Sequence, residues 1–157
     1  MDTRKLVSAF LFQVALFQSF AAGAGQDPSA LHVFAGQPAQ TLSIAELPAA
    51  IRSLLEARIP EGIAAVGTPY NATDAITDES LPSRRLLGAG RTGPIWFVWY
   101  EHGGRGYHQH LALLRSEGAS VEVVASSVIL QRPASLEALQ QLARVGALAE
   151  SPQPEHW

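Results

Sequence analysis

The chain has 157 residues, no cysteine and a formal net charge of −3. The absence of cysteine excludes disulfides, thiolate zinc sites and lipid anchors attached to cysteine, so only histidine and carboxylate remain as strong metal ligands. A slightly acidic chain whose single lysine is Lys5 argues against nucleic acid as a partner, because that binding depends on clustered Lys and Arg.

The first 24 residues have the three-part layout of a secretory signal peptide. A short positive region precedes an apolar stretch over 6–20, and the small residues Ala22 and Ala24 fit a cleavage site. A permanent membrane anchor is the alternative, but polar residues interrupt the apolar stretch, and a span needs about 20 mostly apolar residues. We therefore expect residues 1–24 to be removed, no membrane span in the rest of the chain, and a periplasmic or secreted location.

Two different patterns follow the predicted signal peptide. Residues 25–42 are rich in Gly, Pro, Ala and Gln, which predicts an extended lead-in with one short strand over 31–34. The pattern over 43–59 is helical, because apolar residues recur at spacings of three and four and Ser43-x-x-Glu46 can form a capping box. Pro48 is tolerated only in the first turn of a helix, so the helix is expected to begin close to it.

The remaining chain reads mostly as strands. Residues 68–83 form a polar connection of a length that is usually either functional or mobile. Short glycine-containing turns then separate four candidate strands and force antiparallel neighbours; the strands are 84–89, 95–102, 107–115 and 120–130. A second helix is expected after Pro133, with Gly146 as its C-cap, and residues 149–157 are expected to form a disordered tail.

These elements predict an α+β fold, with an N-terminal helix, a four-stranded antiparallel β-meander and a C-terminal helix in a single domain over 43–148. Such a sheet would have one face covered by helices and the other face free to meet a partner.

The hairpin over 95–114 concentrates the side chains that can bind something. Its glycine-rich tip, 103–106, supplies the positive φ angles that a tight reversal requires. A turn centred on Gly104 and Arg105 pairs Glu101 with His108 and Trp99 with His110. Alternation then places one set of residues on a partly exposed face, namely Phe97, Trp99, Glu101, His108 and His110. The core face receives Trp96, Val98, Tyr100, His102, Tyr107, Gln109, Leu111 and Leu113.

Two histidines at i and i+2 on a strand, with a carboxylate opposite, can converge on one metal ion. His108, His110 and Glu101 would give zinc three ligands and leave a fourth position for water, which the metal could activate for hydrolysis. A further ligand or base would have to come from His32, His102 or Asp74. The commoner alternative is a Glu101–His108 ion pair beside a Trp99–His110 contact. No H-E-x-x-H or comparable motif supports a metal enzyme.

Arg105 at the apex of the hairpin suggests a different function. An arginine on a glycine turn, with Trp99, Tyr100, His102 and Tyr107 on the adjoining strands, is typical of anchors in protein interfaces. A solvated turn residue is the plainer interpretation of Arg105. The chain has no sequence motif for nucleophilic catalysis. The favoured interpretation is therefore an exported, non-enzymatic binding or inhibitory module that presents the hairpin to a protein or glycan, and a metal-binding protein or metal-dependent hydrolase is the alternative.

Overall fold

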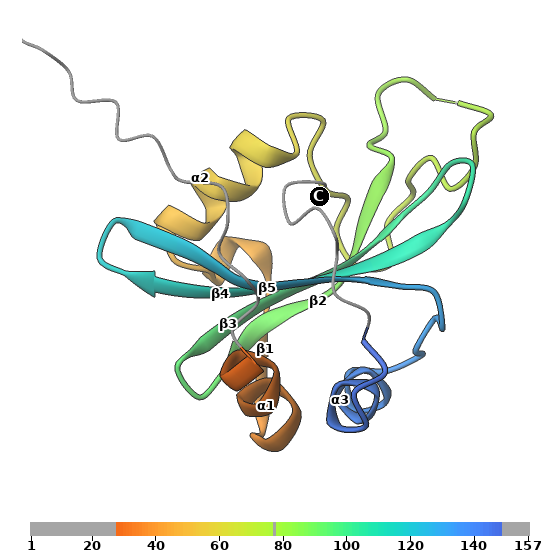
Figure 1. Cartoon of the computed structure of the whole chain (residues 1–157). Helices are drawn as coiled ribbons and strands as arrows, with labels where there is room; N and C mark the ends of the chain where they lie inside the picture. The colour runs from red at the N-terminus through yellow and green to blue at the C-terminus, as the bar shows by residue number, and fades with distance from the viewer. Residues whose placement is uncertain (1–27, 77, 149–157) are drawn as a thin grey trace, which may run out of the picture.

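The computed structural model describes residues 28–76 and 78–148, and it shows an α+β fold built on a five-stranded antiparallel sheet (Figure 1). The elements in chain order are α1 (Pro28–Gly36), β1 (Ala39–Leu42), η1 (Ile44–Glu46), α2 (Ala49–Arg58), β2 (Arg84–Thr92), β3 (Ile95–His102), β4 (His108–Glu117), β5 (Ser120–Ile129) and α3 (Leu136–Arg144). The strands pair in sequence order, so the predicted meander is present and β3 is its central strand. The predicted signal peptide, 1–24, and the predicted tail, 149–157, lie outside the described residues.

The lead-in departs from the prediction in two ways. Residues 31–34, expected as a strand, belong to helix α1, and the fifth strand is β1, which pairs with β2. Packing explains the helix, because Ala30 and Phe34 lie one turn apart and are both buried in a cluster with Leu139 of α3. The Pro- and Gly-rich composition predicted an extended segment, but the burial of a short apolar helix face stabilises a helix there.

The predicted helix over 43–59 is interrupted at Pro48. The capping box is present, with the backbone N–H of Ser43 donating to the Glu46 carboxylate at 2.8 Å, but it begins only the single turn of η1. Helix α2 starts at Ala49, with Pro48 as its N-cap residue. Proline has no N–H to donate and restricts the residue before it, which separates the two helical segments.

Both faces of the sheet are covered by helices, contrary to the prediction that one face would be free. Helices α1 and α3 pack on one side of the sheet and α2 packs on the other (Figure 1). On the α1/α3 face the core includes Phe97, Trp99, Leu111 and Leu113, and on the α2 face it includes Val98, Tyr100, Ala112 and Leu114. Strand β3 is therefore buried on both sides, which accounts for its nearly continuous apolar sequence.

The register of the central hairpin differs by one residue from the prediction. His102 pairs with His108, Tyr100 with His110, and Trp99 with Leu111. The turn is therefore centred on Arg105 and not on the Gly104–Arg105 bond. A slip of one residue moves every side chain of one strand to the other face, so His108 and His110 join His102 on the α2 face and Tyr107 and Gln109 join Glu101 on the other.

The connection over 68–83 packs on the tip of this hairpin. The N–H of Gly103 donates to the carbonyl of Ser83 at 2.9 Å, and the N–H of Gly104 donates to the carbonyl of Ala72 at 3.2 Å. The approach is close, because a Cβ atom on Gly103 would lie 2.1 Å from the carbonyl oxygen of Asn71. Asn71 is itself buried, and its side-chain amide donates to two carbonyls of the same loop. The loop and the hairpin tip thus form one packed unit.

No described helix is long and apolar enough to cross a membrane.

Candidate functional site

Three histidines converge on the α2 face of the hairpin, close to its glycine-rich tip. His102 is the last residue of β3, and His108 and His110 are the first and third residues of β4. Each ring offers one nitrogen, and these three nitrogens all lie within 4.8 Å of one another. The ring centroids are 4.5 Å apart for His108 and His110 and 5.2 Å apart for His102 and His108. We refer to His102, His108 and His110 as the histidine cluster.

The pairing of the strands explains why the cluster forms. His102 and His108 are direct cross-strand partners, and His110 lies two residues farther along β4 on the same face. Tyr100, the partner of His110, stacks on its ring at 4.9 Å with an interplanar angle of 7°. A buried tyrosine ring therefore fixes one imidazole, and the other two rings, which are half-buried, lie against it.

Hydrogen bonding within the described residues leaves ring nitrogens of His108 and His110 available to a cation. Nδ1 of His108 lies 2.6 Å from the carbonyl oxygen of Gly106. Because a carbonyl can only accept, Nδ1 carries the proton and Nε2 remains as the coordinating atom. Nε2 of His110 is buried and has no hydrogen-bond partner among the described residues. A buried ring nitrogen without a partner is costly unless something else, such as a metal ion, occupies its lone pair.

Two of the imidazoles, those of His110 and His102, are neutral at physiological pH. Burial lowers the pKa of His110 to about 3, and electrostatic interactions with His108, His102 and Arg84 act in the same direction. Burial also lowers the pKa of His102 to about 4, with Arg84 and His108 contributing. Metal ions bind neutral imidazole, so a cation entering the cluster near pH 7 would not need to displace a proton from these two rings.

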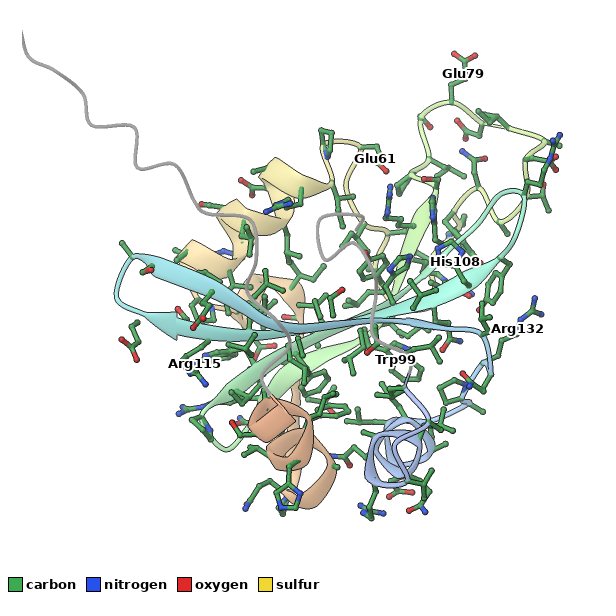
Figure 2. The ribbon with its side chains drawn as sticks, viewed as in Figure 1. Glu61, Glu79, Trp99, His108, Arg115 and Arg132 are labelled. Atoms are coloured by element: carbon green, nitrogen blue, oxygen red, sulfur yellow. The ribbon has the colours of Figure 1, made fainter. Side chains whose placement is uncertain are left out.

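Glu101, the carboxylate expected beside His108, lies on the opposite face. Its carboxylate accepts from Nε of Arg85 and from the hydroxyl of Tyr107, each at 2.6 Å, and it is 4 % exposed. The amide of Gln109 connects Tyr107 to the indole of Trp99. Figure 2 shows the two sides, with His108 on the α2 side of the sheet and Trp99 on the side of α1 and α3. Glu101 is therefore part of a separate buried network and is not among the converging ligands.

The other predicted site residues are dispersed. Trp99 and Tyr100 are buried in the two cores, so neither side chain is presented to a partner. Arg105 is at the tip as expected, with its side chain 92 % exposed and 3.5 Å from the carboxylate of Asp74. Of the three further ligands considered, only His102 reaches the cluster; His32 lies exposed on α1 and Asp74 lies with Arg105.

Arg84 is the residue beside the cluster that the sequence pattern missed. It is the cross-strand partner of His102, so Arg84, His102 and His108 form one row across three strands. The Arg84 side chain is 12 % exposed and forms an ion pair with Glu61, which follows α2. A turn symmetric about Arg105 would have placed the three histidines on one face of the hairpin. Arg84 joins them through the pairing of β2 with β3, whose register shifts between Leu86 and Gly88.

Comparison with known proteins finds no match among family models, curated proteins or solved structures. A proposal for the function must therefore be argued from the chemistry of the histidine cluster.

Proposed function

We propose that this protein binds a divalent transition-metal ion, with zinc as the best match, through His102, His108 and His110. The observation that carries the proposal is the convergence of the three ring nitrogens within 4.8 Å on one sheet face. Nitrogen ligands suit zinc, which takes imidazole at about 2.0–2.1 Å in a tetrahedral arrangement. The carboxylate and carbonyl ligands that suit magnesium, calcium and manganese do not belong to the cluster.

The cluster needs only a small adjustment to hold the ion. Tetrahedral ligands at that bond length lie about 3.4 Å apart, so the nitrogens would have to move inward by about 1 Å. His102 and His108 are half-buried and can rotate, whereas His110 is held by the stacked Tyr100. Three imidazoles leave a fourth position for water, the arrangement of catalytic zinc sites, in which the pKa of the bound water falls to about 7.

Zinc titration of the untagged full chain, together with elemental analysis, tests the proposal. We expect close to one zinc per chain, a rise in the unfolding temperature on zinc addition, and a loss of affinity of at least about 100-fold in a His102→Ala/His108→Ala variant. His32→Ala is the matched control, because it removes an exposed histidine from α1 and leaves the cluster intact. A chain that binds no zinc, or that binds it equally well in the double variant, refutes the proposal.

A second proposal is that the hairpin tip binds a protein or glycan through Arg105, with the protein exported by the signal peptide predicted over 1–24. The exposure of the Arg105 side chain favours it, since among the described residues the guanidinium forms an ion pair with one exposed carboxylate, that of Asp74. Capture of a partner by the wild-type chain that is lost in Arg105→Ala, with zinc binding unchanged, would separate this function from metal binding.

A further inference from the structure

A largely buried arginine, Arg84, lies beside the histidine cluster. Arg84 pairs with His102 across β2 and β3, and neighbouring strands lie about 4.8 Å apart. The guanidinium of Arg84 forms an ion pair with the carboxylate of Glu61. Glu61 lies in the turn after α2, and its side chain is 39 % exposed. The more exposed of the two partners is thus the acid, and the cation is fixed in the sheet.

The charge of a metal ion in this cluster would remain uncompensated by its ligands. Three neutral imidazoles contribute no negative charge, in contrast to sites that include thiolate or carboxylate ligands. The nearest carboxylate along β3, that of Glu101, is on the other face and is already held by Arg85 and Tyr107. A doubly charged ion beside the Arg84 guanidinium therefore creates a strongly positive surface at the fourth coordination position.

We propose that the metal-loaded cluster binds a small oxyanion, the carboxylate or phosphate group of a ligand, with one oxygen on the metal and another on Arg84. This inference rests on the metal binding proposed above. Carboxylate and phosphate match the planar N–H fork of a guanidinium, which forms short, charge-assisted hydrogen bonds with them. The oxyanion would share Arg84 with Glu61 or replace the Glu61 carboxylate, which can turn toward solvent because it is partly exposed.

Cobalt substitution makes the fourth coordination position visible. The full chain is loaded with Co²⁺, whose visible absorption depends on its ligands, and is titrated separately with inorganic phosphate and with acetate. We expect a saturable change in the spectrum at millimolar anion or below, and the two titrations show which oxyanion is preferred. Arg84→Gln is expected to weaken anion binding about tenfold while Co²⁺ binding persists, because a charge-assisted hydrogen bond is lost.

Two further variants keep the test decisive if Arg84→Gln does not fold. Glu61→Gln removes the carboxylate that competes for Arg84, so it is expected to tighten anion binding by about threefold. Arg84→Lys retains the charge without the planar fork and is expected to weaken it by less than Arg84→Gln does. Arg91→Gln is the matched control, because Arg91 lies on the same strand but at its opposite end, over the ring of Trp96.

The outcomes distinguish this inference from the function on which it rests. If the wild-type chain takes up no Co²⁺, metal binding itself is refuted. If Co²⁺ binds but neither anion changes the spectrum, metal binding stands and the oxyanion site is refuted. If anions bind equally well to the wild type and to the Arg84 and Glu61 variants, the role of Arg84 is refuted.

Discussion

Replacement of His110 by glutamine should remove much of the acid sensitivity of the metal-free protein. The folded chain keeps the pKa of this ring at about 3, whereas its ordinary value is 6.5. Between these two values the unfolded chain binds a proton that the folded chain does not bind. The stability that depends on the neutral ring is therefore complete above pH 6.5 and is lost as the pH falls from 6.5 toward 3.

The size of the effect at pH 5 follows from the ordinary pKa alone. At that pH the folded ring is still neutral, and the unfolded ring is about 1.5 pH units below its pKa. Protonation of the unfolded ring then favours unfolding by about 2 kcal/mol relative to neutral pH. His102, whose pKa is lowered to about 4, adds a smaller loss because its ring is more exposed and better screened.

Urea unfolding at pH 7 and pH 5, in the presence of a chelator, measures this difference. Wild type should lose the contributions of both rings, and His110→Gln should lose about 2 kcal/mol less between the two pH values. The comparison uses the change with pH, so any general destabilisation by the substitution cancels. His32→Gln, at an exposed position of α1, controls for the removal of a histidine. An equal loss in wild type and His110→Gln would refute the reasoning.

Three other substitutions test the remaining parts of the hairpin. Glu101→Gln should destabilise the fold by about 2–3 kcal/mol in urea unfolding, since it breaks the ion pair between the buried Glu101 carboxylate and the partly exposed Arg85, but it should leave zinc affinity unchanged; a loss of zinc binding would show that Glu101 is a ligand. Gly103→Ala should lower the unfolding temperature, with a cost of about 1–3 kcal/mol, because the added Cβ meets the backbone of Asn71; an unchanged temperature would contradict the close approach. Arg105→Ala should leave the unfolding midpoint unchanged, because its ion pair is exposed.

A matched control exists for the glycine substitution. A Cβ added to Gly36, at the end of α1, meets nothing within 4 Å. Gly36→Ala should therefore leave the unfolding temperature at or above the wild-type value, because alanine also restricts the unfolded chain more than glycine does.

The sheet could be predicted from the sequence because its signals are local. Strand β3 coincides with the predicted segment 95–102, and short turns with glycine fixed the antiparallel order. Helix α1 and strand β1 were missed, since both depend on distant partners: the helix packs on α3, and the strand pairs with β2. In such cases the burial of a short segment against a distant element decides its secondary structure, whatever its composition predicts. A single sequence does not reveal which distant element that is.

The sequence predicted the hairpin as the location of the candidate site, but it did not predict the correct set of three residues. His108 and His110 were identified from their spacing, whereas Glu101 was assigned to the wrong face by a shift of one residue. The turn spans 103–107, and the N–H of Gly103 at its start donates to the carbonyl of Ser83, which lies outside the hairpin. A contact between the hairpin and a loop some twenty residues earlier leaves no periodic signal in the sequence.

The packing of the 68–83 connection on the hairpin tip has a consequence for local opening motions. The amide hydrogens of Asn71, Gly103 and Gly104 are each held by a carbonyl of this unit. The tip cannot separate from the loop without breaking the bonds of Gly103 and Gly104 together, so these two amides should exchange with solvent through one shared opening event. Two of the histidines, His102 and His108, border the same turn. Occupation of the cluster by a metal ion should therefore slow hydrogen exchange in a loop that contributes no ligand to it.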